Sequence, residues 1–165
     1  WRLPLTVVGA GKAATAMANA VVAILGAEAV HGLVIDVAEA ATASPIAVAA
    51  AGHPLPDLRG LEATRRICEL LRAAGRDGAL CLISGGASSL LVAPRPPLSL
   101  DEKVATVRLL LASGCDIDEL NTVRKHLSTV KGGGLLRLVD GPLATLVLSD
   151  VVGDDFGTIG SGPTS

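Results

Sequence analysis

The fold class is decided by residues 5–25, which read LTVVGAGKAATAMANAVVAIL. The β-branched run at residues 5–8 predicts a strand that stops at the glycine turn beginning with Gly9. The alanine-rich residues 13–25 predict a helix that follows this turn directly. A strand followed at once by a helix is the unit from which α/β proteins are built.

The same alternation continues along the chain. Further strands are predicted at residues 33–37, 46–50, 79–83 and 143–148, and helices at residues 58–74, 100–112 and from 116 or 118 to about 127. Asp57 and Ser99 are the expected N-caps of the first two of these helices, and Gly75 is the expected stop of the first. Residues 135–139 are a further candidate for helix. The chain is therefore predicted to fold as an α/β domain, Rossmann-like, with a mainly parallel sheet and helices on both faces.

The composition limits the classes of function. The chain has 165 residues, a length typical of one domain, a formal net charge of -2, and only Trp1 and Phe156 as aromatic residues. This charge offers no attraction for nucleic acid or an anionic membrane. The apolar residues 13–27 are shorter than the roughly 20 residues of a membrane span. The three cysteines form no C-x-x-C pair, which favours buried thiols in a reducing, cytoplasmic compartment.

Three polar motifs follow predicted strands, at the sheet edge where α/β proteins bind ligands. They are Gly9-Ala-Gly-Lys12, Ser84-Gly-Gly86 and Ser149-Asp150. The first is not a Walker A loop, because Thr6 stands where that motif needs glycine. It fits a dinucleotide fingerprint loosely, with Asp36 at the end of the next strand. A tight turn that carries a solvated lysine is the alternative.

The loop that begins with Ser84-Gly-Gly86 could form an anion site. Its backbone N–H groups and the Ser88 hydroxyl are suitable donors. A nucleophile elbow does not fit, because Leu90 stands where the closing glycine of Gly-x-Ser-x-Gly would be. A loop that only caps the next helix remains the alternative.

The densest polar segment covers residues 121–134. Asn121, Arg124 and Ser128 share one helix face by their spacing. Lys131 precedes three glycines, beginning with Gly132, and this pattern indicates an anion cradle more than a surface. A solvated, charged helix is the alternative interpretation.

Carboxylates gather in the loop after the last predicted strand. Asp150, Asp154 and Asp155 offer the hard oxygen ligands that magnesium prefers. An acidic turn without a metal is the alternative. His53, between Gly52 and Pro54, is a candidate polar group at the cleft, although an isolated histidine more often makes a structural hydrogen bond.

Taken together and in this order, the motifs resemble those of the glycerate 2-kinase family, whose members have an N-terminal α/β domain and a second, C-terminal domain. The similar stretches are residues 9–14, 52–57, 82–86, 88–91, 121–128, 131–133, 148–154 and 161–164. Asn121-Thr-Val-Arg-Lys-His-Leu-Ser128 and the stretch from Ser149-Asp150 to Pro163-Thr164 are the most specific. Ala87 departs from the pattern, because the family usually has glycine there.

The resemblance implies a kinase that uses ATP and Mg2+ to phosphorylate D-glycerate to 2-phosphoglycerate, in a cleft whose other wall belongs to a C-terminal domain that this chain lacks. Without that wall, residues 1–165 are expected to be inactive. The implied catalytic residues are Lys12 and Arg124. The implied phosphate- and nucleotide-binding residues are Gly9, Gly11, Ser84, Gly85, Gly86, Ser88, Lys131 and Gly132, the substrate-binding residues His53 and Asn121, and the metal ligands Asp150 and Asp154.

Two other functions stay open at this point. Some members of the family are labelled hydroxypyruvate reductases, and a nicotinamide-dependent oxidoreductase would place Asp36 on the cofactor ribose. That function leaves Ser84-Gly-Gly86 and the acidic loop unexplained. A ligand-binding α/β module without catalysis is the third hypothesis.

Overall fold

The computed structural model describes residues 1–38, 45–149, 151 and 153–165. Its parallel strands are β1 (Leu5–Ala10), β2 (Val30–Asp36), β3 (Ile46–Ala50), β4 (Ala79–Ser84) and β5 (Leu143–Leu148), in the order β3-β2-β1-β4-β5. Its α-helices are α1 (Ala14–Leu25), α2 (Leu58–Ala74), α3 (Ala87–Leu90), α4 (Leu100–Ser113) and α5 (Ile117–His126). Short 3-10 turns are η1 (Ala27–Ala29), η2 (Gly75–Asp77), η3 (Leu136–Leu138) and η4 (Ile159–Ser161).

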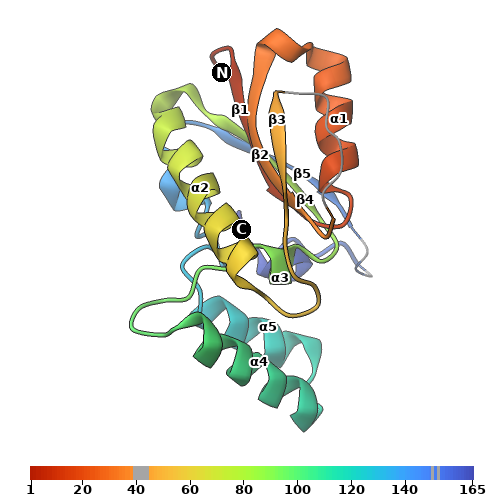
Figure 1. The fold of residues 1–165 in the computed structure, drawn as a ribbon, viewed down its shortest axis with the longest axis vertical. Helices are drawn as coiled ribbons and strands as arrows, with labels where there is room; N and C mark the ends of the chain where they lie inside the picture. Colours follow the sequence, from red (N-terminus) through yellow and green to blue (C-terminus); the bar gives the residue numbers. More distant parts are fainter. Residues whose placement is uncertain (39–44, 150, 152) are drawn as a thin grey trace.

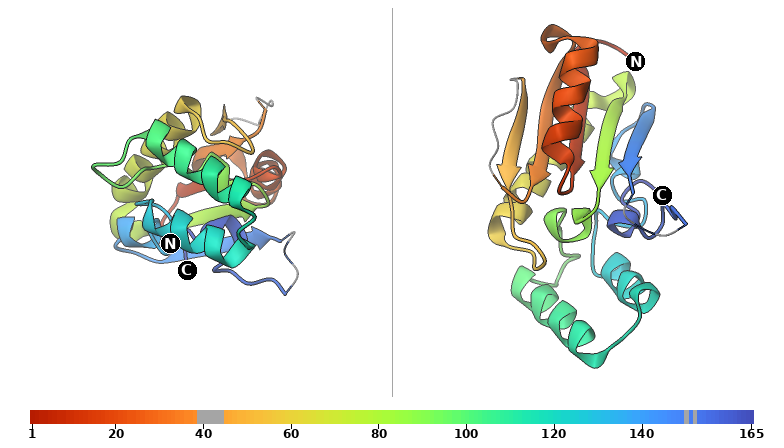
Figure 2. Two further views of the ribbon diagram at one scale, coloured as in Figure 1. Left: turned by 90° about the horizontal axis from the view of Figure 1, so that it is seen from below. Right: turned by 90° about the vertical axis from the view of Figure 1, so that its right-hand side faces the viewer.

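The sheet is covered on both faces, which confirms the predicted fold class. Helix α1 packs on one face and α2 on the other (Figures 1 and 2). The pleat of β1 divides its side chains accordingly, so that Val7 belongs to the core under α1 and Val8 to the core under α2. Both valines are fully buried, as a strand with two covered faces requires.

The predicted caps are confirmed. The Asp57 carboxylate accepts a hydrogen bond from the Gly60 N–H at 3.0 Å and starts α2. Ser99 forms a capping box with Glu102 at the start of α4, and Asp116 forms one with Glu119 at the start of α5.

Residues 135–139 differ from their prediction, because only a single 3-10 turn, η3, forms there. The Leu135 N–H donates to the Pro163 carbonyl, and the N–H groups of Gly132 and Gly133 donate to carbonyls of the same C-terminal segment. Bonds to a distant segment thus replace the local bonds of an α-helix.

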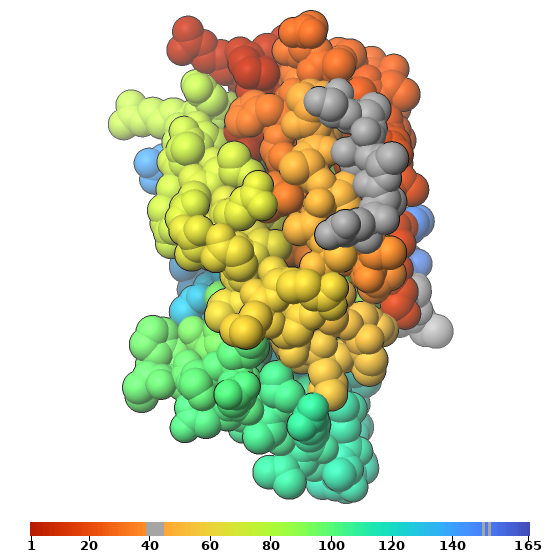
Figure 3. Space-filling model, in the orientation of Figure 1, coloured from red at the N-terminus to blue at the C-terminus, as the bar shows by residue number. Residues whose placement is uncertain are grey.

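Helices α4 and α5 lie beyond the carboxyl ends of the strands (Figure 2). In Figure 3, α4 packs against the loop before α2 and the start of that helix. The only α4 side chains that are buried are Lys103 and Val107. Within the described part of the chain, no helix has both the length and the apolarity to cross a membrane.

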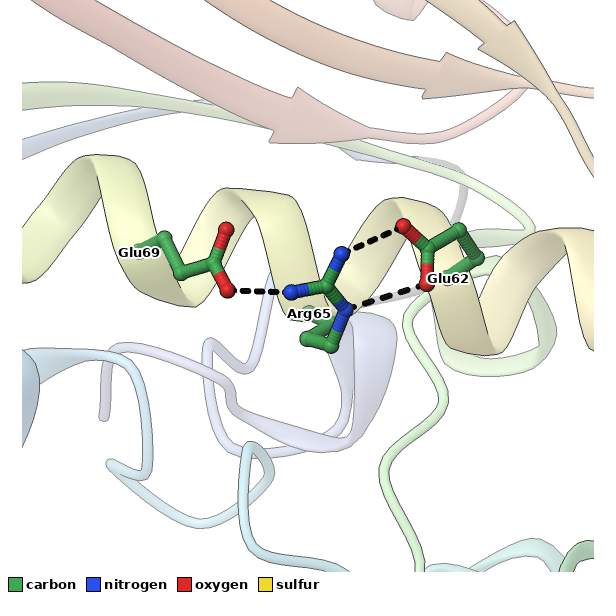
Figure 4. A network of polar contacts seen from close by, with 3 residues as sticks. All are labelled: Glu62, Arg65 and Glu69. Carbon is green, nitrogen blue, oxygen red and sulfur yellow. Dashed lines mark hydrogen bonds and ion pairs between the residues drawn. The ribbon is translucent and has the colours of Figure 1, made fainter.

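The solvent face of α2 carries an ion-pair network, drawn in Figure 4. Arg65 donates to Glu62 and to Glu69, one turn away on either side. More than half of each side chain is exposed, so water screens these pairs and they contribute little to stability.

Candidate functional site: a pocket at the carboxyl edge of the sheet

The two glycine motifs meet because their strands are neighbours. Gly9 of β1 pairs with Leu82 of β4, and a Cβ on Gly9 would collide with the Leu82 carbonyl oxygen. Gly11 has φ +140°, and a Cβ there would collide with Ser84. Close approach of two strand ends therefore explains both glycines. These contacts give no support to the prediction that Gly9 and Gly11 bind phosphate.

The turn after β1 has few donors left for a ligand. The Gly11 N–H donates to Ile35 O at 3.1 Å, and the Lys12 N–H donates to Gly85 O at 2.9 Å. The Ser84 hydroxyl, which is buried, accepts from the Ala13 N–H at 3.1 Å. The free N–H groups that an anion would use at the start of α1 are thus occupied, and the exposed Lys12 ammonium remains as the cation of this turn.

Asp36 has a structural role that leaves little of its carboxylate for the proposed contact with a ribose. One carboxylate oxygen accepts from the Thr15 N–H at 3.1 Å and from the Thr15 hydroxyl at 2.7 Å. The other accepts from the Val37 N–H at 2.7 Å, and the residue is 6% exposed. This carboxylate ties β2 to the first turn of α1, so the feature that favoured a nicotinamide cofactor is explained without one.

Lys12, His53 and Gly86 come together above the ends of β1 and β4. Gly86 has φ +87°, and a Cβ there would lie 3.1 Å from His53 Cδ2 and 3.2 Å from Lys12 Cγ. Partial burial and the neighbouring Lys12 ammonium lower the pKa of the His53 imidazole. This shift favours the neutral imidazole, which can donate from one ring nitrogen and accept at the other.

A pocket of about 260 Å³ opens at this edge, between the loop after β4 and helix α5. Its wall includes six of the residues predicted for the site: His53, Gly85, Gly86, Ser88, Asn121 and Arg124. The rest of the wall is formed by Pro54, Ser89, Ile117, Val151, Thr158, Ile159 and Gly160. Larger grooves of about 590 and 460 Å³ lie elsewhere, but none of the predicted site residues lines them.

A chain of hydrogen bonds braces the pocket wall. The Ser161 hydroxyl donates to Asn121 Oδ1 at 2.8 Å and lies 2.8 Å from the Ser88 hydroxyl. Because Ser161 has a single hydroxyl hydrogen, the Ser88 hydroxyl must be the donor in the second bond. Three segments of the chain are thereby joined: α3, η4 and α5.

Ser161 is a site residue that was not among the predicted ones. It is completely buried and has φ +62°, a strained value for a residue with a side chain. The available signal was its place in the Ser161-Gly-Pro-Thr164 stretch of the family resemblance.

Arg124 is the cation of the pocket wall. Its guanidinium has no carboxylate within ion-pair distance among the described residues. Burial lowers the pKa of Arg124. A guanidinium nevertheless stays charged in proteins. A half-buried cation without an anionic partner favours a ligand that carries negative charge.

Lys131 and Gly132 do not form the open anion cradle expected from the sequence. The Lys131 ammonium group is buried and donates to Ser88 O at 2.7 Å and to Leu91 O at 3.2 Å. The Gly132 N–H donates to Ser161 O, and the Gly133 N–H to Gly162 O. The segment supports the pocket from behind instead of lining it.

The acidic loop is described only in part. Asp150 lies outside the described residues. Asp154 is exposed, with φ +51°, and does not line the pocket. Asp155 accepts from the Thr158 hydroxyl at 2.6 Å and so makes a local acidic turn. No group of three metal-ligating side chains occurs among the described residues, and the magnesium ligands stay a prediction.

Known proteins resemble this chain along nearly all of its length. A provisionally named hydroxypyruvate reductase from Agrobacterium vitis is 47% identical over 161 residues, which cover 96% of this chain and 37% of that protein. A glycerate 2-kinase from Pyrococcus horikoshii is 42% identical over 160 residues, 96% of this chain and 36% of that protein. The crystal structure of a glycerate kinase from Thermotoga maritima superimposes with a TM-score of 0.91 at 39% identity, covering 99% of this chain and 40% of that one.

The chain thus spans about two fifths of the length of these relatives. A family model described as a domain of unknown function, DUF4147, matches residues 3–165. The chain belongs to the DUF4147 family.

Proposed function

We propose that this chain is part of a kinase that transfers a phosphoryl group from ATP to D-glycerate and forms 2-phosphoglycerate. The observation that carries the proposal is the near-complete match of this chain, in sequence and in fold, to glycerate kinases. The pocket supports it independently, because its wall combines a guanidinium without an anionic partner with the polar groups of Ser88 and Asn121.

The site has the equipment that phosphoryl transfer needs. This reaction depends on positioning and on cations near the charged oxygens, and little on covalent chemistry by the protein. In the proposed arrangement Arg124 holds the carboxylate of D-glycerate, and Asn121 and His53 bind its hydroxyl groups. Lys12, exposed at the rim, lies where it can stabilise charge that develops on the transferring group.

Magnesium and the nucleotide are the finer part of the proposal. Mg2+ commonly binds through one or two carboxylates and the phosphates of the nucleotide, and retains several waters. The exposed Asp154 carboxylate, in the loop that follows β5, fits such a role, with Asp150 as its expected companion. When bound, the ion would neutralise negative charge on the phosphates.

We also propose that a second domain of the whole protein closes the pocket. The pocket is open to solvent, and a kinase must exclude water from the transferring group. The relatives are more than twice as long as this chain, which leaves ample length for such a domain.

The test is a pair of assays on the whole protein. The first follows product formation from D-glycerate, ATP and Mg2+ with enolase as the coupling enzyme and without phosphoglycerate mutase. Because enolase acts on 2-phosphoglycerate directly, a signal identifies both the activity and the product. The second assay follows NADH oxidation with hydroxypyruvate. If the protein oxidises NADH with hydroxypyruvate and does not phosphorylate D-glycerate, the proposed kinase function is wrong and a reductase function is supported.

A further inference from the structure

Lys103 is an unusual side chain for the inner face of a helix. It is 2% exposed and is among the largest fully buried side chains of the described chain. Its ammonium group donates to the carbonyl oxygen of Leu127 at 3.0 Å. Leu127 is the C-cap of α5, so Lys103 attaches α4 to the negative end of the helix that carries Asn121 and Arg124.

Among the described residues, the ionisable groups that act on Lys103 from the neighbouring elements are basic. Arg124 approaches from α5, and Lys131 from the segment after α5. No described carboxylate lies within ion-pair distance of any of these three cations.

The other charged groups of α4 are directed elsewhere. Asp101, Glu102 and Arg108 are exposed, and Glu102 is engaged in the capping box of Ser99. Lys103 is thus the single charged side chain of α4 that faces α5, the helix that contributes Arg124 to the pocket wall.

Three basic side chains that are buried or half-buried, without an acid beside them, oppose folding in their charged forms, and burial lowers the pKa of Lys131 well below its ordinary value. Burial removes water from each charge, and mutual repulsion adds to this cost. A leucine or methionine at position 103 would fill the same space without the cost of burying a charge. An anion in the pocket would offset both costs, because Arg124 lines the pocket and Lys103 and Lys131 stand behind it.

We infer that Lys103 is a positioning residue for the anionic substrate, which holds α5 in place and adds positive charge behind Arg124. The inference rests on the proposed function only for the identity of the anion as D-glycerate. It concerns a residue outside the pocket wall and outside the predicted site.

Anion binding should therefore depend on pH through Lys103. Burial, reinforced by repulsion from Arg124, lowers the pKa of Lys103 to about 8. An anion in the pocket favours the charged ammonium and raises that pKa. Binding at pH 8 is accompanied by uptake of at most about half a proton, because about half of the Lys103 side chains are already protonated there. The affinity falls as the pH rises above 8, and the total loss is about tenfold for each unit by which the anion raises the pKa.

The test is calorimetry on the whole protein with two probes, D-glycerate and inorganic phosphate. Each titration is repeated in two buffers of different ionisation enthalpy, so that proton uptake is measured directly. The variants are Lys103→Met, Lys103→Arg and, as a control, Arg108→Met. Arg108 is a matched control because it lies on the same helix, carries the same charge and is exposed.

We expect Lys103→Met to bind both probes about tenfold more weakly at pH 7 and to converge with the wild type at about pH 10, where the lysine is neutral. Lys103→Arg should bind tightly at both pH values with less proton uptake, because arginine keeps its proton. Arg108→Met should behave as the wild type. If Lys103→Met does not fold, the comparison of proton uptake between the wild type and Lys103→Arg is sufficient to test the inference.

Unchanged proton uptake in Lys103→Arg, or equal pH curves for the wild type and Lys103→Met, would overturn the inference while leaving the kinase intact. Another outcome is that the protein binds phosphate with an affinity whose pH dependence requires Lys103, and does not bind D-glycerate at all. That result would reject D-glycerate as the substrate but support the role of Lys103. Binding of neither probe would overturn the inference, and the enolase-coupled assay would still judge the kinase separately.

Discussion

At the scale of single residues, the structure separates side chains that face the pocket from those that only shape it. Arg124 and His53 line the cavity, and Lys12 lies beside His53 and Gly86. Ser84 and Lys131, which looked equally functional in the sequence, are hydrogen-bonded inside the protein. Substitutions in the two groups should therefore affect different kinetic constants.

Lys12→Met in the whole enzyme should lower turnover at least 100-fold and change the KM for D-glycerate much less. The reason is that an exposed cation at the rim can interact more strongly with the transition state than with bound substrate. Steady-state kinetics with D-glycerate and ATP measure both constants, and Lys12→Arg is the control that retains the charge. Unchanged turnover in Lys12→Met would remove this residue from the catalytic group.

Ser161→Ala should raise the KM for D-glycerate and lower the free energy of unfolding by about 1–3 kcal/mol. The substitution takes away the donor to Asn121 Oδ1 and leaves a buried acceptor unsatisfied. Urea unfolding and initial-rate kinetics measure the two effects. Ser113→Ala, at an exposed serine near the end of α4, is the matched control. Equal stability of the two variants would contradict the bracing role.

At the scale of elements, local signals predicted the fold well. The strand β3 and the helix α2 have their predicted bounds, because β-branched runs, Asp57 and Gly75 act within a few residues of where they stand. The partners of the site residues could not be predicted this way. The Lys131 ammonium bonds to Ser88, 43 positions earlier, so only the folded chain reveals that it is not available to an anion.

The attachment of α4 to α5 should make stability depend on pH. The pKa of Lys103 is about 8 in the folded protein, whereas the ordinary lysine value of 10.5 applies to the unfolded chain. Between these values the unfolded chain binds more protons, so the free energy of unfolding rises with pH, by at most about 3 kcal/mol. Urea titrations from pH 7 to about pH 10.5 test this, with a smaller rise expected in Lys103→Met, where Lys131, whose pKa burial also lowers, still contributes a rise of the same sign. A parallel rise in Lys103→Met would assign the effect to another group.

At the scale of the whole molecule, the described chain provides a pocket that we propose is one wall of the complete site. The sheet, α3 and α5 bring the polar groups together, and the pocket is open to solvent. The order of the strands was not predicted, because pairing of β1 with β4 depends on contacts across about 70 residues of sequence.

Residues 1–165 alone should show no D-glycerate-dependent release of ADP, although they should still bind D-glycerate weakly. Phosphoryl transfer needs two substrates in line and exclusion of water, and one open wall provides neither. The isolated chain, checked for folding by circular dichroism, is assayed beside the whole protein. Turnover comparable to that of the whole protein would mean that the second wall is unnecessary.

The central claim is that the pocket between the loop after β4 and helix α5 binds D-glycerate through Arg124. A crystal structure of the whole protein with D-glycerate tests it most directly, through the distance between the Arg124 guanidinium and the substrate carboxylate. The claim predicts an ion pair, with a nitrogen–oxygen distance of at most about 4 Å. D-glycerate bound away from Arg124, for example in the groove between α2 and α4, would contradict it.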